Sequence, residues 1–306
     1  YLGNGVTSFT ETDESILVNL SDGKQLATRL VILSIGVKPN SELARSAGLA
    51  LNARGGIVVD KTLRTSDPDI FAVGDVIEVE DFISKGKTMI PLAGPANKQG
   101  RIAAGNIAGE NDQYPGTQGS AIVKIFDVCA ANTGANEKTL LKNGLIKGKD
   151  YEKLIILQNS HAGYYPGASP MAIKLLFSTD GNKIFGAQII GKEGVDKRID
   201  TIGTAIRLGG TIWDLKSFEF AYAPPFSSAK DPVNMAGFVA ENILKSRVFF
   251  AEWDVVERHD PEKTILLDVR EDAERRTYAL SGALNIPLGQ IRSKLSEIDK
   301  EKEIII

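Results

Sequence analysis

The sequence predicts an α/β fold at the start of the chain, an α+β domain after it and a smaller α/β unit at the end. Residues 30–37, LVILSIGV, are almost continuously apolar, as in a strand that is buried on both faces of a parallel sheet. Beyond the polar, Gly- and Pro-bearing linker Glu110–Ser120, strand-like and helix-like stretches follow in a mixed order. With 306 residues, the chain has room for two or three domains.

The first part of the chain predicts strands and one long helix. Residues 15–26 alternate apolar and polar side chains around Asp22-Gly23, which is a strong signal for a β-hairpin. A helix rich in small residues is expected from Ile90 to Gly109, where small side chains allow close approach to a neighbour or a ligand. The sequence also predicts a buried strand at 30–37, a short amphipathic stretch at 41–49, a hairpin at 55–60 and a second buried strand at 69–75.

The rest of the chain predicts a mixed domain and a third unit. Strands are expected in AIVKIF, KLIILQ, MAIKLLFS and IFGAQIIG, which begin at residues 121, 153, 171 and 184, with helices near Glu137–Asn143 and Lys197–Leu208. The third unit begins near Val248 and predicts a strand at 263–271, a loop with a short strand at 279–288, a helix at 289–298 and a strand that begins at 303.

The composition argues against several classes of function. A net charge of −3 provides no basic surface for nucleic acid, and no apolar run approaches the roughly 20 residues that span a bilayer. Cys129 is the single cysteine, so no internal disulfide can form, which fits a reducing cytoplasm. The chain opens without methionine and ends in the apolar run KEIII, and we therefore expect it to be a fragment of a longer protein.

Two stretches carry residues suited to chemistry. In RTSDPDIFAVGD, Gly74-Asp75 follows a predicted strand, where open α/β sheets bind ligands; the carboxylate could accept a hydrogen bond from a sugar or ribitol hydroxyl, or cap the next element. In FEFAYAPPFSSAKDPVN, two adjacent prolines exclude a long helix or a central strand. The stiff loop carries Tyr222, Phe226 and Lys230, and is either a packed connection or a functional loop.

The first of these stretches resembles a known family. TSDPDIFAVGD resembles the second flavin-binding motif of the pyridine nucleotide–disulfide oxidoreductases. VILSIGVKPN resembles the strand that precedes this motif, and PLAGPANKQGRIAAGNIAG resembles the helix that follows it. The resemblance implies that Asp75, next to Gly74, holds the ribitol of FAD. It also implies that the helix start, formed by Pro91, Leu92 and Ala93, faces the flavin, where the helix dipole favours negative charge.

Three further stretches, HAGYYPG, GKEGVDKRID and FAYAPPFSSAKDPVN, resemble the coenzyme A-disulfide reductase group of that family. The resemblance implies a homodimer whose active site is shared between subunits, with Tyr222 and Phe226 near the partner's FAD and Tyr164 as a companion at the thiol site. By the same resemblance Lys230 faces a coenzyme A phosphate, and Asn97 stands where relatives have a substrate-contacting polar residue, often histidine.

Other candidates receive structural interpretations. Cys129 is expected to be a small buried residue, because the redox cysteine of the family belongs to an N-terminal half that this sequence does not contain. His161 needs no catalytic role, and the Lys197-Arg198 pair is interpreted as a solvated helix start or, preferably, a dimer contact. The last unit resembles the opening half of a rhodanese domain, in which Asp268 and Arg270 are expected to form a structural ion pair.

The resemblance implies a domain order and an activity. We expect the end of an NAD(P)-binding domain at 1–35, the C-terminal part of an FAD-binding domain at 36–116, a dimerisation domain at 117–246 and a partial rhodanese-like domain at 247–306. The implied activity is NAD(P)H-driven, FAD-dependent reduction of coenzyme A disulfide, or of a persulfide or polysulfide of coenzyme A. The alternatives are an NADH oxidase or peroxidase of the same superfamily and, for the fragment alone, a non-catalytic dimerisation module.

Overall fold

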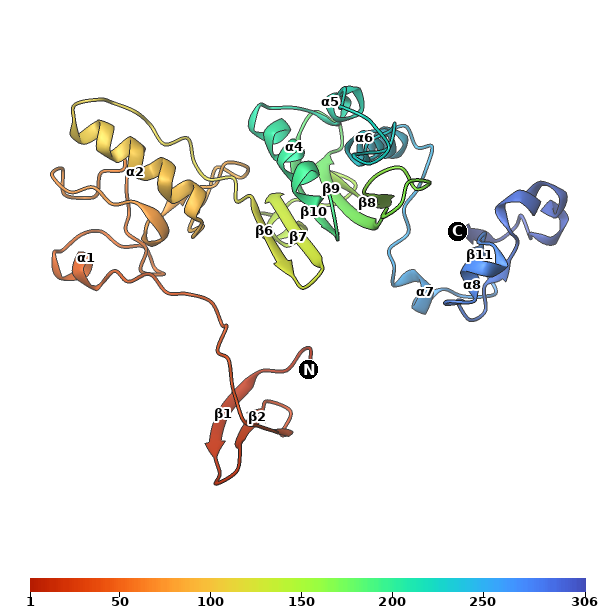
Figure 1. Ribbon diagram of the computed structural model, residues 1–306, viewed down its shortest axis with the longest axis horizontal. Helices are drawn as coiled ribbons and strands as arrows, with labels where there is room; N and C mark the ends of the chain where they lie inside the picture. Colours follow the sequence, from red (N-terminus) through yellow and green to blue (C-terminus); the bar gives the residue numbers. More distant parts are fainter. The chain divides into compact units, whose positions relative to one another are not determined.

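The computed structural model describes residues 1–306, which form two compact units. The first comprises residues 1–80 and 86–117, and the second comprises residues 81–85 and 118–306 (Figure 1). No helix in the structure combines the length and the apolarity that crossing a bilayer requires. The four domain boundaries expected from the sequence remain predictions.

The first unit contains a small antiparallel sheet and one long helix. Its elements are β1 Val6–Glu11, β2 Ile16–Leu20, β3 Gln25–Thr28, α1 Glu42–Ser46, the 3₁₀ helix η1 Gly74–Val76, β4 Val79–Glu80, β5 Lys87–Thr88 and α2 Ala93–Ile107. Strands β2 and β3 pair from Ile16 with Thr28 to Asn19 with Gln25, which confirms the hairpin around Asp22-Gly23. Gly23 has a φ of 83°, a conformation that glycine adopts without steric cost.

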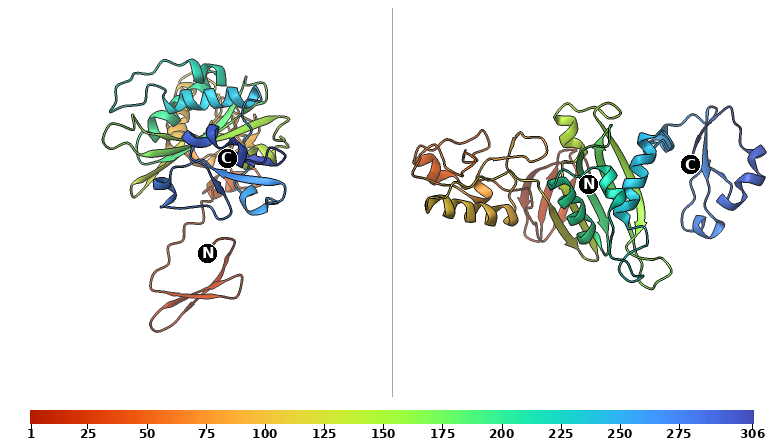
Figure 2. Two further views of the ribbon diagram at one scale, coloured as in Figure 1. Left: turned by 90° about the vertical axis from the view of Figure 1, so that its right-hand side faces the viewer. Right: turned by 90° about the horizontal axis from the view of Figure 1, so that it is seen from above.

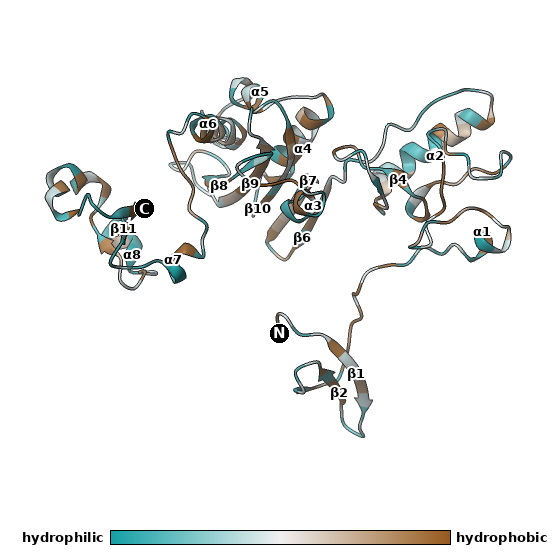
Figure 3. Ribbon diagram, turned by 180° about the vertical axis from the view of Figure 1, so that it is seen from behind, coloured by the Kyte–Doolittle hydropathy of each residue, from teal (hydrophilic) through white to brown (hydrophobic).

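Two predicted strands of the first unit are wrong. Residues 30–37 form no strand, and Leu30, Ile32 and Ile35 are exposed; Figure 3 shows this extended, largely hydrophobic segment after β3. A central strand of a parallel sheet needs neighbouring strands to pair with and helices to cover its faces, and no strand of the structure pairs with residues 30–37. Residues 69–75 likewise form only an isolated bridge, between Arg64 and Phe71, before η1 begins.

The second unit is built on a five-stranded antiparallel sheet in the order β6-β7-β10-β9-β8. Helices α4 and α6 pack against this sheet (Figures 1 and 2). The elements are β6 Ala121–Ile125, β7 Val128–Gly134, α3 Glu137–Lys142, β8 Tyr151–Asn159, β9 Pro170–Ser178, β10 Ile184–Gly191, α4 Val195–Arg207, α5 Ile212–Ser217 and α6 Pro232–Leu244. The four predicted strands and both predicted helices are confirmed, and β7, α5 and α6 are additional.

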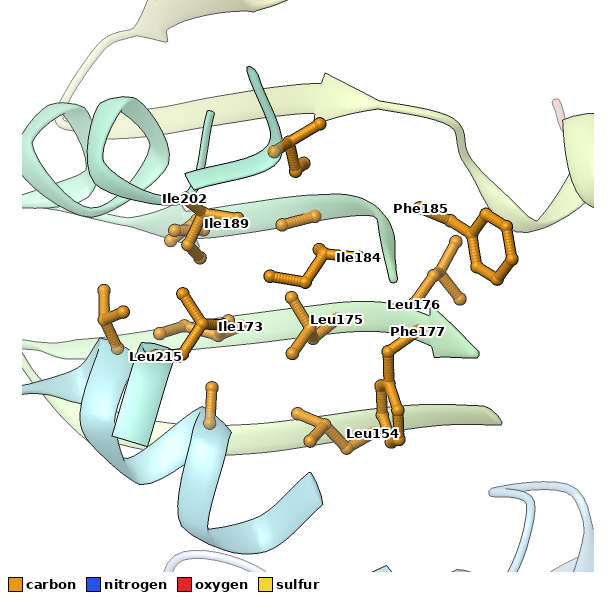
Figure 4. Close-up of a cluster of buried hydrophobic side chains, with 14 of the residues drawn as sticks. Leu154, Ile173, Leu175, Leu176, Phe177, Ile184, Phe185, Ile189, Ile202 and Leu215 are labelled. Carbon is orange, nitrogen blue, oxygen red and sulfur yellow. The ribbon is translucent and has the colours of Figure 1, made fainter. Parts of the chain in front are cut away.

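The core of the second unit lies between this sheet and its helices. Ile189 pairs with Ile173 on the neighbouring strand, and Ile173 pairs with Ile156 on the next, so branched side chains form a row across β10, β9 and β8. Ile202 of α4 and Leu215 of α5 are fully buried in the same cluster (Figure 4). Burying each such side chain stabilises the fold by about 1.5–3 kcal/mol, so this sheet is a rigid support for the loops at its ends.

The opposite face of the sheet carries a second apolar row. Val123, Ala130, Ile190, Ala172 and Leu157 follow one another across all five strands in register. Val123, Ile190 and Leu157 are more than half exposed. An apolar stripe of this length on one sheet face is a typical feature of an interaction surface.

The C-terminal part of the second unit contains a parallel sheet in the order β12-β11-β13. Its elements are α7 Val255–Arg258, β11 Thr264–Asp268, α8 Asp272–Arg275, β12 Leu284–Asn285, η2 Leu288–Ser293, η3 Leu295–Glu297 and β13 Glu303–Ile305. The three predicted strands are confirmed. The predicted helix at 289–298 is wrong in type, because the chain forms two short 3₁₀ segments there, over Leu288–Ser293 and Leu295–Glu297.

Candidate active site

Two loops of the second unit bring a pair of tyrosines together. Tyr164 lies on the loop between β8 and β9, and Tyr222 lies on the loop between α5 and α6. Their hydroxyl oxygens are 3.1 Å apart and hydrogen-bonded, while the two rings are 78% and 47% exposed. The structure therefore presents two adjacent phenols at its surface, and their role at a thiol site remains a prediction.

The hydrogen bond between the phenols has an electrostatic effect. It raises the pKa of Tyr222 above its ordinary value, and partial burial adds to the effect. Because an unperturbed tyrosine already titrates near pH 10, Tyr222 keeps its proton at neutral pH. The pair can thus donate a hydrogen bond to an anionic sulfur that approaches it.

The loop that carries Tyr222 is held by its own turns and by the other loop. Phe226 donates its backbone N–H to the carbonyl of Ala223, which closes a turn over the two prolines. The backbone N–H of Ala162 donates to the carbonyl oxygens of Pro224 and Ser227, at 3.3 and 3.0 Å. The prediction that the two prolines exclude a long helix or a central strand here is confirmed, since α6 begins only at Pro232. The two tyrosine loops form one connected structure.

His161 braces the loop that carries Tyr164. Its ring is buried, its Nδ1 lies 3.1 Å from Ser160 Oγ, and its Nε2 lies 3.2 Å from the carbonyl oxygen of Pro166. It also packs edge-on against Tyr165. Both ring nitrogens therefore have partners inside the loop, so the imidazole helps to hold the fold of this loop.

The interpretation of Arg198 as a solvated or dimer-contacting residue is wrong. Arg198 is 1% exposed within this single chain, so no partner can reach it, and it forms an ion pair with Asp231 at 3.0 Å. Lys197, the other member of the pair, is 3.9 Å from the same carboxylate and partly exposed. This burial could not be predicted from the local sequence, because the partner lies 33 residues away and on a different helix.

The remaining predicted residues of this unit, Phe226 and Lys230, are exposed on the Tyr222 loop. Lys230 immediately precedes Asp231, whose side chain accepts from the backbone N–H of Val233 and so caps α6. The Asp-Pro pair at the helix start is the sequence signal that could have identified this cap. Cys129 packs against the core but is only partly buried, so the expectation of a small buried residue is met in part.

The residues predicted to hold a flavin lie in the first unit. Gly74 has a φ of 87° and donates its backbone N–H to Gln99 Oε1 at 2.7 Å, so it lies against α2. Asp75 follows in the exposed first turn of η1. Gln99, which fixes this contact, is a buried residue that the sequence interpretation missed.

The start of α2 has free hydrogen-bonding capacity. The helix begins at Ala93 after Pro91 and Leu92, and no side chain caps its first turn. The first backbone N–H groups of a helix have no partner within it, so they are available to a ligand. An exposed carboxylate in η1 together with an uncapped helix start suits a polyol chain and an electron-rich ring edge, so these residues fit FAD.

Asn97 lies one turn further along α2. It is exposed, and its side-chain amide donates to the carbonyl of Ala93 at 2.9 Å. One side-chain oxygen therefore remains for a ligand, and its substrate contact remains a prediction.

In the C-terminal part, Arg270 and Asp268 form a bidentate ion pair. Arg270 Nε and Nη2 donate to the two carboxylate oxygens at 2.9 and 2.8 Å, and Nη2 also donates to the carbonyl of Tyr278. These hydrogen bonds hold the pKa of Asp268 at about 2. The pair lies in the wall of a cavity of about 590 Å³ and orients the segment after β11, as expected for a structural ion pair.

Comparisons with known proteins match both units. Residues 1–100 match the pyridine nucleotide-disulphide oxidoreductase family, and residues 120–232 match its dimerisation domain. The coenzyme A disulfide reductase of Staphylococcus epidermidis is 36% identical over 225 residues, which are 73% of this chain and 50% of the relative.

Two solved structures are similar along nearly the whole chain. Reduced Bacillus anthracis CoADR-RHD is 46% identical with a TM-score of 0.89, over 98% of this chain and 53% of that chain. A NAD-dependent persulfide reductase from A. fulgidus is 36% identical with a TM-score of 0.90, over 98% of this chain and 54% of that chain. The chain thus spans about half the length of these relatives.

Proposed function

The chain belongs to the pyridine nucleotide-disulphide oxidoreductase family, and we propose that it is the C-terminal part of an FAD-dependent, NAD(P)H-driven reductase of coenzyme A disulfide or persulfide. The names of the relatives, a coenzyme A disulfide reductase and a persulfide reductase, support this substrate class. The observation that carries the proposal is the hydrogen-bonded pair of Tyr164 and Tyr222.

In the proposed mechanism the tyrosines assist the thiol chemistry. A cysteine thiolate outside this chain attacks one sulfur of the disulfide, so that a new S–S bond forms as the old one breaks and a thiolate leaves. Tyr222, which is protonated at neutral pH, donates a hydrogen bond to that leaving thiolate. The stiff loop holds the phenol in place, so little entropy is lost when the substrate binds.

The first unit would hold the flavin. Asp75 would accept a hydrogen bond from the ribitol, and the N–H groups at the start of α2 would face the ring. When bound, FAD would pass reducing equivalents from NAD(P)H to the redox cysteine. Lys230 would contact a phosphate of coenzyme A, and Phe226 would contact the partner's flavin. Asn97 would contact the substrate.

A homodimer with a shared active site is part of the proposal. The chain carries the family's dimerisation domain, and the apolar row Val123–Ala130–Ile190–Ala172–Leu157 offers a surface that a second copy can cover. The exposed tyrosine pair favours contribution of this loop to a site completed by another subunit. Residues 247–306 are proposed to begin a rhodanese-like domain, for which the parallel sheet around β11 is the support.

Two alternatives make different predictions. An NADH oxidase or peroxidase would use the same flavin-binding residues but would need neither a phenol pair nor a lysine for coenzyme A. A non-catalytic dimerisation module would need no exposed phenols. In the complete protein, NAD(P)H consumption should depend on coenzyme A disulfide or persulfide. Turnover with oxygen or peroxide in the absence of thiols would instead identify an oxidase or peroxidase. For residues 1–306 expressed alone, dimer formation without FAD binding would favour the non-catalytic module.

A further inference from the structure

The guanidinium group of Arg198, in the first turns of α4, is the centre of a buried polar cluster. Its Nη2 donates to the carbonyl of Ser160 at 2.9 Å, to Ser227 Oγ at 3.1 Å and to Asp231 Oδ2 at 3.0 Å. Its Nη1 donates to the carbonyl of Gly194 at 3.2 Å. Arg198, Ser160, Ser227 and Asp231 are each 3% exposed or less.

Each of these partners belongs to a segment that supports a tyrosine. Ser160 begins the loop that carries Tyr164, and Ser227 lies five residues after Tyr222 on the other loop. Ser227 Oγ also donates to Asp231 Oδ2 at 2.6 Å, which ties that loop to the start of α6. The Arg198 side chain therefore connects the two tyrosine loops through buried hydrogen bonds.

Stability alone gives a weak reason for this cluster. Moving a guanidinium and a carboxylate out of water costs several kcal/mol per ion, and apolar residues of similar volume often make a fold as stable or more stable. What apolar residues cannot do is fix the relative position of two loops through directed hydrogen bonds.

The backbone before α4 is adapted to this arginine. Gly194, at the start of the helix, has a φ of 71°, a conformation that other residues rarely adopt. A Cβ atom at this position would lie 2.2 Å from Arg198 Nη1. The guanidinium therefore occupies the space that a side chain at position 194 would need, and only glycine fits there.

We propose that Arg198 is a positioning residue that fixes the Tyr164 loop against the Tyr222 loop and so sets the distance between the two phenols. The inference about turnover rests on the proposed function; the inference about loop geometry does not.

The test uses the complete protein with Arg198→Lys, which keeps the charge and loses the planar fork, and Arg207→Lys as control. Arg207 lies on the same helix and is exposed. Hydrogen exchange should rise at least fivefold in 160–169 and 218–231 of the Arg198 variant and stay unchanged in β9 and β10. Ser227→Ala, a milder change, should raise exchange in the same two loops. The inference would be overturned if hydrogen exchange stayed unchanged in both loops of both variants. A rise in exchange throughout the chain would also overturn it.

Kinetics separate positioning from general destabilisation. Arg198→Lys should lower kcat with coenzyme A disulfide about tenfold or more, while flavin content and the rate of flavin reduction by NAD(P)H stay unchanged. In a Tyr222→Phe background, the same substitution should change kcat less than twofold, because the arginine acts through the tyrosine. Independent, multiplicative effects would contradict that coupling. If Tyr222→Phe alone leaves turnover unchanged while the loops still loosen, the proposed role of the tyrosines fails and the positioning role stands.

Discussion

Tyr164 and Tyr222 lie 58 residues apart in the sequence, yet their hydroxyl oxygens are 3.1 Å apart. Two loops with different neighbours in the fold, one after β8 and one before α6, meet at this hydrogen bond. The contact depends on the elements that flank the two loops. Strands β8 and β9 fix the ends of the Tyr164 loop, and helices α5 and α6 fix the ends of the Tyr222 loop.

Replacing Tyr222 by phenylalanine should impair thiol chemistry and leave the flavin in place. Without its hydroxyl, the ring cannot donate to a leaving thiolate, so kcat with coenzyme A disulfide should fall about tenfold to a hundredfold in the complete protein. Tyr165→Phe is the matched control, because Tyr165 is next to Tyr164 and half-exposed. Stopped-flow measurement of both half-reactions checks the prediction, and equal rates in the variant and the wild type would remove Tyr222 from the mechanism.

Replacing Asp75 by alanine should lower FAD occupancy of the complete protein. The carboxylate is the acceptor proposed for the ribitol, and a charge-assisted hydrogen bond is worth about 1.5–3 kcal/mol, so affinity should fall roughly tenfold to a hundredfold. Asp69→Ala, on the same loop, should leave flavin content unchanged. The ratio of flavin absorbance to protein absorbance after dialysis measures the effect, and a fully yellow Asp75 variant would contradict it.

Reversing the charge at Lys230 should weaken the binding of coenzyme A disulfide without affecting that of NAD(P)H. Lys230→Glu would repel a coenzyme A phosphate, so KM for coenzyme A disulfide should rise about tenfold while KM for NAD(P)H stays the same. Lys138→Glu, an exposed lysine in the first turn of α3, is the control. Equal changes in both KM values would exclude a phosphate contact.

Glu137 should make stability depend on pH in the acidic range. Burial alone would raise the pKa of Glu137, but hydrogen bonds from Lys174 and Lys153 and their charges outweigh burial and hold the pKa at about 2. A carboxyl whose folded pKa lies below its unfolded value stabilises the fold above about pH 4.5, and this stability is lost as pH falls toward 2.

The expected loss is roughly 1–2 kcal/mol, less than the full shift implies, because water still reaches the group. Urea unfolding between pH 3 and pH 7 measures it, and Glu137→Gln should flatten the pH dependence. The same dependence in both proteins would show that other carboxyl groups cause it.

A charge in the exposed apolar row should weaken self-association. Leu157 lies at the end of this row on the edge strand β8 and is 74% exposed. Leu157→Lys would bury a charge if a second copy covers the row, so the dimer dissociation constant should rise at least tenfold. Sedimentation across a range of concentrations tests this, with Leu208→Lys, an exposed residue just after α4, as the control. An unchanged constant would mean that dimerisation uses another surface.

The local patterns of the sequence predicted much of the fold. The Asp22-Gly23 turn needs only its neighbours, so the hairpin could be read directly, and the apolar strands of the five-stranded sheet were recognisable by their length and composition. β7 was missed as a separate strand because its small and polar residues, including Cys129 and Asn132, lack the β-branched character of its neighbours.

Contacts between distant segments could not be predicted. Residues 30–37 have the composition of a buried strand, yet burial depends on partners that no local pattern specifies. The Tyr164–Tyr222 pair followed from a resemblance and not from spacing. The burial of Arg198 was hidden, because a charged residue at a helix start is usually solvated, and only the fold brings Ser160 and Asp231 to it.

The shared arginine also limits how these loops can be exchanged between proteins. A loop-swapping experiment that moved only residues 160–169 into another scaffold would leave Ser160 without its guanidinium. A graft of the Pro-Pro segment alone would carry Ser227 and Asp231 without their cation. If Arg198 positions the loops as we propose, a graft of the phenol pair needs both loops and the start of α4 together, including Gly194, which makes room for the arginine.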